Sequence, residues 1–149
     1  MAKIINMQLM RYINLFGKIC RISTTNCFVY NNTIFFGVDK RDVSQAIGKA
    51  GINIKKLSET FGRKVKIVSM IKINNEEEHP EEKLKEFIGS VVSPVGFSKI
   101  ELSDNTHEMV ITAGGKQNKA GLIGRNRTRE QELKGILEEF FNIHRLRIA

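Results

Sequence analysis

The chain repeats one order of predicted elements, and this repeat limits its fold more than any single motif does. Each half shows a helical apolar pattern, two β-rich runs joined by a turn, a short helix, a glycine-containing loop, a second helix and a final strand. The segment AIGKAGINIKKL at 46–57 aligns by position with LIGRNRTREQEL at 122–133. The sequence therefore predicts two copies of one small α+β module rather than one mixed domain.

The first half is expected to form a helix, a hairpin, two helices around a glycine loop, and a strand. The hairpin prediction rests on Asn31 and Asn32, because asparagine tolerates the positive φ of a tight turn. The expected elements are a helix over 7–16 that stops at Gly17, strands over 27–30 and 33–38, a short helix capped by Asp39 or Asp42, a helix that ends at Gly62, and a strand over 64–68.

The second half is expected to follow the same order. Its turn signals are Ser93 with Pro94 after the first helix and Asp104-Asn105-Thr106 between the strands. The expected elements are a helix over 84–92, strands over 97–102 and 109–113, a short helical segment to Ile123, a helix over 133–140 and a strand over 143–148.

A polar and acidic cluster at 74–82 separates the two halves. We therefore expect a first domain with its N-terminal helix over 1–75, an acidic linker over 76–82 and a second domain over 83–149. Charge is divided unequally: Lys plus Arg minus Asp plus Glu gives 13 − 3 = +10 for residues 1–75 and 11 − 13 = −2 for residues 76–149, which sum to the net +8. The surface that attracts polyanions is expected mainly in the first half.

Several classes of protein do not fit the sequence. No stretch has the roughly 20 apolar residues of a membrane span, and the N-terminus lacks the pattern of a secretory signal, so we expect a cytoplasmic protein without a membrane partner. A monomer is also expected. No zinc-site spacing, phosphate loop, nucleophile elbow or HExxH motif is present, so no enzyme activity, metal or cofactor is expected. Cys20 and Cys27 are expected to be reduced, partly buried thiols, with a disulfide or a redox role as the alternative.

The loop Gly48-Lys49-Ala50-Gly51 is the strongest candidate for a binding site. Two glycines between two helices let the backbone approach a phosphate, while the following helix points its free N–H groups there. Lys49 adds a charge inside the loop, and Lys55 and Lys56 lie at the start of the next helix. A GxxG sequence alone also occurs as a helix cap, so the surrounding sequence must decide whether this loop binds phosphate.

That context resembles a KH domain of the prokaryotic arrangement, as the segment VDKRDVSQAIGKAGINIKKLSETFGRKVKIV shows. With its second copy, the chain is similar to small archaeal NusA-like proteins, through MRYINLF, AIGKAG, GRKVKIV, FIGSVVSP and AGLIGRN. The resemblance implies an α+β fold of two tandem prokaryotic-type (type II) KH domains, each a small three-stranded sheet packed by helices. It implies binding of single-stranded RNA in transcription elongation and termination.

The resemblance also implies which residues would contact RNA. Those of the first unit are Ile47, Gly48, Lys49, Ala50, Gly51, Ile52, Asn53, Lys55 and Lys56, and those of the second are Gly124, Arg125, Asn126 and Arg127. Bases would lie on an apolar floor whose available residues are Val43, Ile47, Ile52, Ile54, Val65 and Ile67, each of which is also an ordinary core position.

The second loop departs from the family pattern because Arg127 replaces the second glycine. In one interpretation, Arg125 and Arg127 grip phosphates directly while Asn126 adopts the left-handed conformation of the turn. In the other, the close backbone approach is lost, and the unit binds more weakly, with altered geometry, or serves as a structural partner. The net −2 of this half favours the second interpretation.

Other functions compete with RNA binding. The main alternative is a protein-binding scaffold or ribosome-assembly factor with degenerate RNA binding, and duplex DNA is a further candidate ligand. RNA polymerase or a nascent transcript complex is a candidate partner by the resemblance. Contact with polymerase is in doubt because the chain has no room for the polymerase-binding and OB-fold domains of bacterial NusA.

Overall fold

The computed structural model describes residues 7–71, 80–103 and 107–149. The chain divides into two compact units, Met1–Met70 and Ile71–Ala149. Residues 76–79 of the predicted linker lie outside the described residues, whereas Glu81 and Glu82 already form the first turn of a helix. The exact domain bounds predicted from the sequence therefore remain a prediction.

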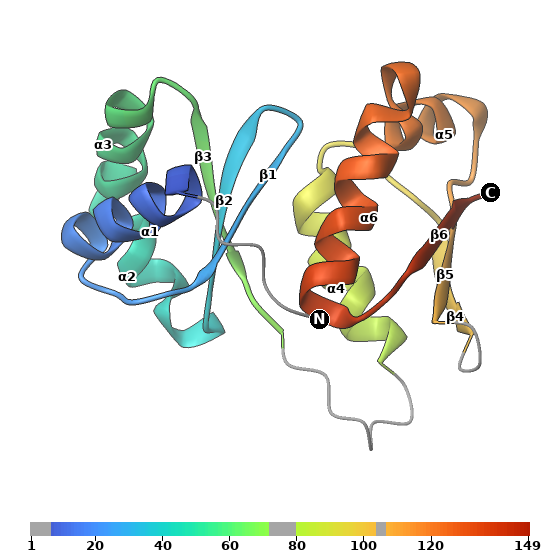
Figure 1. The fold of residues 1–149 in the computed structure, drawn as a ribbon, viewed down its shortest axis with the longest axis horizontal. Coiled ribbons are helices and arrows are strands. Elements are labelled where there is room, and N and C mark those ends of the chain that lie inside the picture. Colours follow the sequence, from blue (N-terminus) through green and yellow to red (C-terminus); the bar gives the residue numbers. More distant parts are fainter. Residues whose placement is uncertain (1–6, 72–79, 104–106) are drawn as a thin grey trace. The chain divides into compact units, whose positions relative to one another are not determined.

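Unit 1 is a three-stranded sheet covered on one face by helices (Figure 1). Strand β2 is central, antiparallel to β1 and parallel to β3, with Val29 opposite Ile34 and Ile34 opposite Val65. Its elements are α1 (Met7–Cys20), β1 (Asn26–Tyr30), β2 (Thr33–Val38), the 3₁₀ turn η1 (Lys40–Asp42), α2 (Val43–Ile47), the 3₁₀ turn η2 (Lys49–Gly51), α3 (Ile52–Phe61) and β3 (Lys64–Ser69).

The hairpin between β1 and β2 is confirmed, because Asn31 and Asn32 have φ values of 49° and 58°. Two consecutive residues with positive φ match the turn that suits the twist of paired strands. Strand β2 is buried along its whole length. The hairpin thus supplies the apolar strand on which the helices pack.

The core of unit 1 lies between the helices and the inner face of this sheet. The rings of Phe16 in α1 and Phe36 in β2 stack with centroids 4.4 Å apart. Buried residues of this core are Tyr12, Phe16, Cys20, Cys27, Ile34, Phe36, Val38, Ala46, Leu57 and Val65. Packing of these large side chains fixes α2 and α3, and with them the glycine loop, against the sheet.

Two local predictions for unit 1 were wrong. Gly17 does not end the first helix, which continues to Cys20 because this side chain packs into the core; the helix ends where Arg21 takes a φ of 59°. Asp39 and Asp42 precede η1 and α2, but neither side chain makes a capping hydrogen bond. Tertiary packing overrides the propensity of one residue in the first case.

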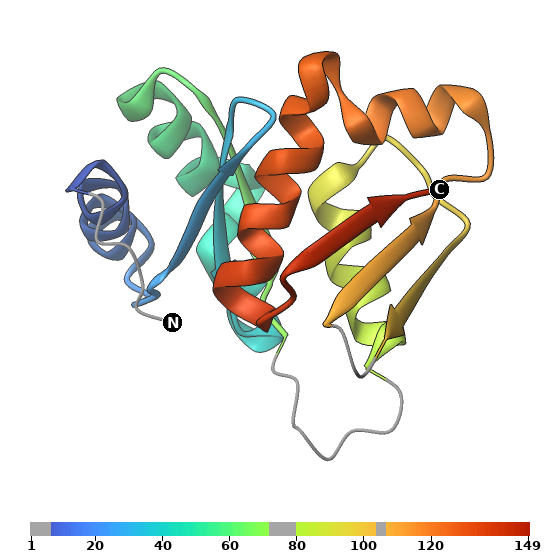
Figure 2. The same ribbon diagram turned by 45° about the vertical axis from the view of Figure 1, so that its right-hand side comes forward.

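Unit 2 repeats the architecture, with three helices on one face of a three-stranded sheet (Figure 2). Central strand β5 is antiparallel to β4 and parallel to β6. Its elements are α4 (Glu81–Val92), β4 (Lys99–Ser103), β5 (Glu108–Thr112), α5 (Lys116–Ile123), the 3₁₀ turn η3 (Arg125–Arg127), α6 (Thr128–Phe141) and β6 (Arg145–Ile148). The turn predicted at 104–106 lies outside the described residues. The predicted repeat of one α+β module is confirmed.

Both cysteines are free thiols in the interior, as expected. The Cys20 thiol donates a hydrogen bond to the Ala46 carbonyl oxygen at 3.3 Å, which links the end of α1 to α2. Burial raises the pKa of Cys20 from 9.0 to about 11. A buried thiol resists ionisation because a thiolate would lose its hydration.

This pKa shift predicts a loss of stability in alkali. The unfolded chain ionises Cys20 near pH 9 and the folded chain only near pH 11, so the stabilisation is complete below pH 9 and declines between these values. We expect the free energy of unfolding to fall by about 2 kcal/mol more in the wild type than in Cys20→Ala across this range. Urea titrations at pH 8, 9, 10 and 11 measure the difference, and equal pH profiles for both proteins would contradict it.

Candidate nucleic-acid interface

The first glycine loop joins α2 to α3 through one 3₁₀ turn. Gly48 has φ 81° and ψ 166°, a backbone conformation essentially reserved for glycine. Its N–H donates to the Ser44 carbonyl at 3.0 Å, and the Gly51 N–H donates back to the Gly48 carbonyl at 3.1 Å. These bonds close a compact turn whose tip is formed by the exposed residues Lys49 and Ala50.

Glycine at position 48 is required by packing as well as by conformation. A Cβ there would lie 2.9 Å from the Cγ of Asn53 and 3.0 Å from the Cγ2 of Ile52. The Asn53 amide donates to the Gln45 carbonyl at 3.2 Å, so it bridges α3 and α2 behind the loop. Asn53, predicted as an RNA contact, has a side-chain amide that holds the two helices together.

Gly51 differs from Gly48 in its surroundings. It adopts the left-handed conformation, with φ 72° and ψ 21°, and a Cβ built on it would meet nothing within 4 Å. Glycine is therefore not needed here to avoid a neighbour in the protein. Its missing side chain leaves the outer face of the loop open, where a phosphate could approach the backbone.

The two glycines are expected to respond unequally to alanine. Gly48→Ala should destabilise the protein by about 3 kcal/mol, through strain and overlap with Asn53, and Gly51→Ala by only about 1 kcal/mol, through its positive φ. Urea unfolding of both variants checks the difference. Equal losses would show that the contacts around Gly48 are relieved by small shifts.

Three lysines lie in this loop and at the start of the helix that follows it. Lys49, Lys55 and Lys56 are exposed, and none has a carboxylate partner among the described residues. No side chain caps the N-terminus of α3, whose N-cap is Gly51. The Gly51 and Ile52 N–H groups donate to the Gly48 and Lys49 carbonyls within the turn, and the positive end of the helix dipole favours an anion there. Lys49 lies in the loop and Lys55 and Lys56 lie within the first two turns of α3, so all three add positive charge near the loop.

The apolar residues beside the loop are only partly available as a floor for bases. Ile52 is 48% exposed and Ile47 is half-buried, so both present apolar surface next to the loop. Val65 is only 5% exposed and belongs to the core, so its inclusion in the floor was wrong. Alternation along β3 turns this side chain towards α2 and α3.

The second loop has the same backbone as the first. Gly124 has φ 75° and ψ 173°, close to Gly48, and Asn126 has φ 56° and ψ 29°, close to the 55° and 26° of Ala50. Arg127 takes the left-handed conformation of Gly51, with φ 59° and ψ 22°. The left-handed turn predicted for Asn126 is confirmed. The loops therefore differ in side chains and not in backbone path.

The bridge behind the loop is also repeated. Arg129 aligns with Asn53, and its Nη1 donates to the Gly121 carbonyl at 3.3 Å, as Asn53 donates to Gln45 in unit 1. A Cβ on Gly124 would lie 2.8 Å from the Cγ of Arg129, so glycine is again required. Sequence reasoning missed this role of Arg129, although the repeat alignment pairs it with Asn53.

The start of the helix after the second loop carries carboxylates, whereas the start of the helix after the first loop carries none. Lys56 aligns with Glu132, Ile54 with Glu130, and Glu130 lies in the first turn of α6. Arg125 and Arg127 are exposed at the loop itself, without a carboxylate partner among the residues that the structure describes. A polyanion at this loop would meet two cations and then a carboxylate-bearing helix.

Arg127→Gly is expected to stabilise the protein. A left-handed conformation costs a residue with a Cβ about 1 kcal/mol, and glycine removes that cost without changing the backbone path. Urea unfolding should show a gain of about 1 kcal/mol, whereas Arg125→Gly, at a position with negative φ, should show a loss. A loss in Arg127→Gly would mean that its side chain makes a stabilising contact.

The structure places the predicted residues of each unit around its own loop. In unit 1, Lys49 and Ala50 form the tip, Ile47 and Ile52 flank it, and the two lysines lie on the first turns of α3. Among the described residues no cluster of three or more His, Cys, Asp or Glu could hold a metal ion. None of the helices in the described ranges is long and apolar enough to cross a membrane.

Comparison with known proteins gives partial matches. No family model matches the chain. It is 39% identical over 56 residues to a protein named probable transcription termination protein NusA from Methanocaldococcus jannaschii, covering 38% of this chain and 31% of that protein. It is 25% identical over 99 residues to one of the same name from Methanococcus vannielii, covering 66% of this chain and 51% of that protein. The matches thus span a third to a half of the length of these curated relatives. The predicted resemblance to archaeal NusA-like proteins is confirmed.

One solved structure supports the fold along almost the whole chain. The crystal structure of APE1850 superposes with a TM-score of 0.67 at 22% identity, covering 97% of this chain and 100% of the other. At this identity the likeness concerns the fold alone. The α+β fold with two small three-stranded sheets, each packed by helices, agrees with the predicted tandem type II KH domains.

Proposed function

We propose that the chain binds single-stranded RNA through the glycine loop of unit 1. The observation that carries the proposal is the open outer face at Gly51, beside a helix N-terminus without a side-chain cap. Lys49, Lys55 and Lys56 lie next to it and have no carboxylate partner in the described part of the chain. Phosphates would lie against the loop backbone, and one or two bases would contact Ile47 and Ile52. Recognition in this form needs no catalytic group, metal or cofactor.

Unit 2 acts in the proposal as an auxiliary site. Its loop keeps the backbone path, and Arg125 and Arg127 supply two guanidinium groups that suit phosphate oxygens. The Cβ of Arg127 stands where unit 1 leaves open space, and Glu130 and Glu132 would repel RNA that continued along α6. We therefore expect weaker binding there than at the first loop.

The proposed process is transcription elongation and termination. Two relatives carry the name probable transcription termination protein NusA, and a protein of that kind would meet its RNA as a nascent transcript. The proposal includes a cytoplasmic monomer that contacts the transcript, with RNA polymerase as a further candidate partner. The basic surface of unit 1 supports the transcript contact in particular.

The proposal is tested by comparing nucleic acids of different form. Fluorescence-anisotropy titrations of the full chain should show at least about tenfold tighter binding to a mixed-sequence single-stranded RNA of 12 nucleotides than to its duplex, because paired bases cannot reach the apolar residues. Equal affinity for both forms would mean that charge attraction alone accounts for the binding. Binding to neither would favour a protein-binding scaffold.

A further inference from the structure

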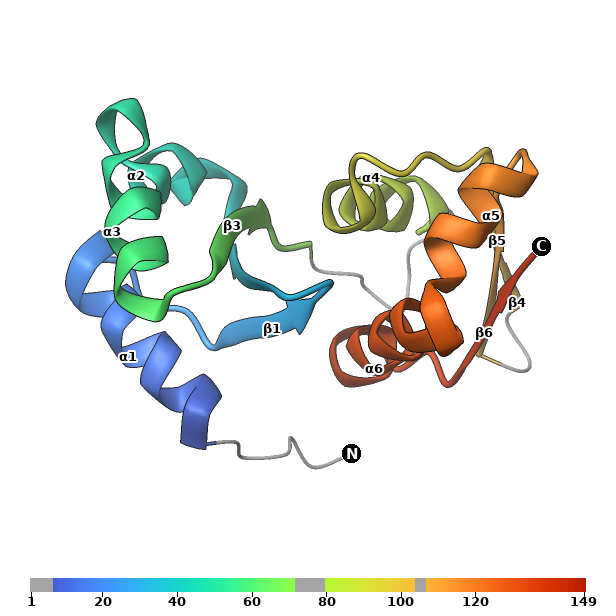
Figure 3. The same cartoon turned by 90° about the horizontal axis from the view of Figure 1, so that it is seen from above.

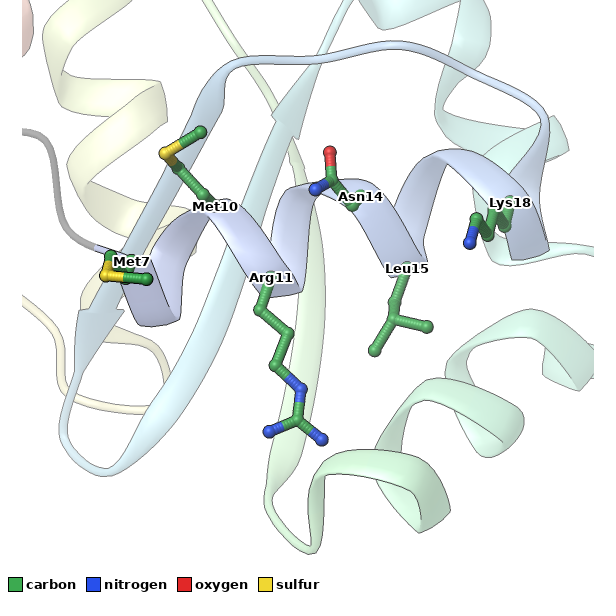
Figure 4. Close-up of a pocket in the computed structure, with 6 residues that line it drawn as sticks. All are labelled: Met7, Met10, Arg11, Asn14, Leu15 and Lys18. Atoms are coloured by element: carbon green, nitrogen blue, oxygen red, sulfur yellow. The ribbon is translucent and has the colours of Figure 1, made fainter.

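Helix α1 presents a second, chemically different surface on its solvent side. Its inner face carries Tyr12, Phe16 and Cys20 into the core. The opposite stripe follows the spacing of one helix face and lines a hollow of about 520 Å³, shown with its side chains in Figure 4. The lining residues are Met7, Met10, Arg11, Asn14, Leu15 and Lys18. We call these residues the α1 stripe.

The α1 stripe is unusually apolar for an exposed helix face. Met7 is 85% exposed and Met10 is 49% exposed; among the described residues the only other large hydrophobic side chain so exposed is Ile52, beside the glycine loop. Methionine is flexible and polarizable, and it is over-used on surfaces that accept helical partners. Two exposed methionines one turn apart therefore indicate a docking surface.

The charges on the α1 stripe determine which partner fits. Arg11 and Lys18 lie two turns apart on it, and α1 contains no acidic residue. Neither cation has a carboxylate partner among the described residues. A second copy of this chain would bring two more cations from its own α1. We propose that the α1 stripe binds an amphipathic helix of a protein partner, whose apolar side chains cover Met7, Met10 and Leu15 while its carboxylates pair with Arg11 and Lys18.

The Met7 end of the α1 stripe is separate from the RNA loop. Within unit 1, the loop between α2 and α3 lies at one end and the Met7 end of α1 at the other (Figure 3). One chain could therefore hold RNA and a protein helix at the same time.

The surface is small, which suits a transient contact. A helix of 14 residues is about 21 Å long, and one helix laid along it buries less area than a standard stable interface. Charge pairs at the rim of such a contact contribute mainly to specificity and to the rate of association. A change of charge on the stripe should therefore change which partner binds.

The test uses two synthetic helical peptides with the same leucine stripe, one flanked by glutamates and the other by lysines. Each is titrated into the full ¹⁵N-labelled chain while the amide signals of α1 are followed. We expect the glutamate peptide to bind at least tenfold more tightly than the lysine peptide, with shifts confined to α1 and its neighbours. Arg11→Glu/Lys18→Glu should reverse the preference, since both side chains are exposed and the fold is retained.

A matched control changes the net charge equally at the other site. Lys55→Glu/Lys56→Glu should leave peptide binding unchanged and weaken RNA binding. Arg11→Glu/Lys18→Glu should weaken binding of the glutamate peptide and leave RNA binding unchanged. The docking proposal thus fails or stands independently of RNA binding. It is overturned if neither peptide shifts the α1 signals, or if Arg11→Glu/Lys18→Glu loses RNA affinity instead of peptide affinity. It is also overturned if anionic vesicles compete with the peptide for α1, or if sedimentation shows a dimer that dissociates in Met7→Ser/Met10→Ser.

Discussion

Lys49→Asp/Ala50→Asp should reduce the affinity for single-stranded RNA by about 100-fold or more. The exposed tip of the first loop would exchange one positive charge for two negative ones, at the position where a phosphate would approach the backbone. The variant loses a charge-assisted contact and adds repulsion. Together these effects should cost about 3 kcal/mol of binding free energy, which is about 100-fold in the dissociation constant. Anisotropy titrations of wild type and variant measure this ratio.

The double aspartate variant is expected to fold normally. Ala50 has a φ of 55°, a conformation that aspartate accepts more readily than alanine does, and both positions are exposed. Urea unfolding should therefore give a free energy within about 1 kcal/mol of wild type. Arg125→Asp/Asn126→Asp is the control at the aligned positions of unit 2 and should weaken binding less than tenfold. Unchanged affinity in the first variant would mean that the loop is only a connection between helices.

Salt should weaken RNA binding steeply. A KH loop holds about four nucleotides, and neutralising four phosphates of a single strand gives a slope of about −2.8 for the logarithm of the association constant against the logarithm of salt concentration. Between 50 and 200 mM KCl the affinity should fall about 50-fold. The lysines around the loop have no carboxylate partner among the described residues, so these cations are available for phosphates.

The salt titration separates the proposed function from its main alternative. A scaffold that bound its partner through apolar contact would keep its affinity over this range, because apolar burial releases no counterions. Each phosphate-binding lysine that is removed should make the slope about 0.7 less negative, so Lys55→Ala/Lys56→Ala should give a slope of about −1.4. An unchanged slope in that variant would place the ionic contacts elsewhere on the protein.

Most of the fold could be predicted from the sequence because it depends on patterns within short segments. Helical apolar spacing, the Asn31-Asn32 turn and the repeat itself indicated the elements and their order. The end of α1 could not be predicted, since it depends on packing of Cys20 against residues distant in sequence. The caps expected from Asp39 and Asp42 failed for a similar reason: residue type marks the position but does not fix the side-chain hydrogen bond.

The candidate site was predicted less completely than the fold. The sequence identified the residues of both loops, but it could not distinguish the two glycines, because Gly48 is enclosed by Asn53 whereas Gly51 faces open space. Nor could it show that Arg127 retains the backbone path of a glycine, since arginine rarely adopts that conformation. Both facts depend on neighbouring atoms in the folded chain.

An NMR titration of the ¹⁵N-labelled full chain with a short single-stranded RNA tests the central claim most directly. The signals of Gly48 to Gly51, and of the first turns of α3, should shift at the lowest RNA concentrations, and those of Gly124 to Arg127 only at higher ones. Signals of α1 should stay in place. Early shifts in α1 or in the second loop, with the first loop unmoved, would contradict the assignment of the first glycine loop as the main RNA-binding site.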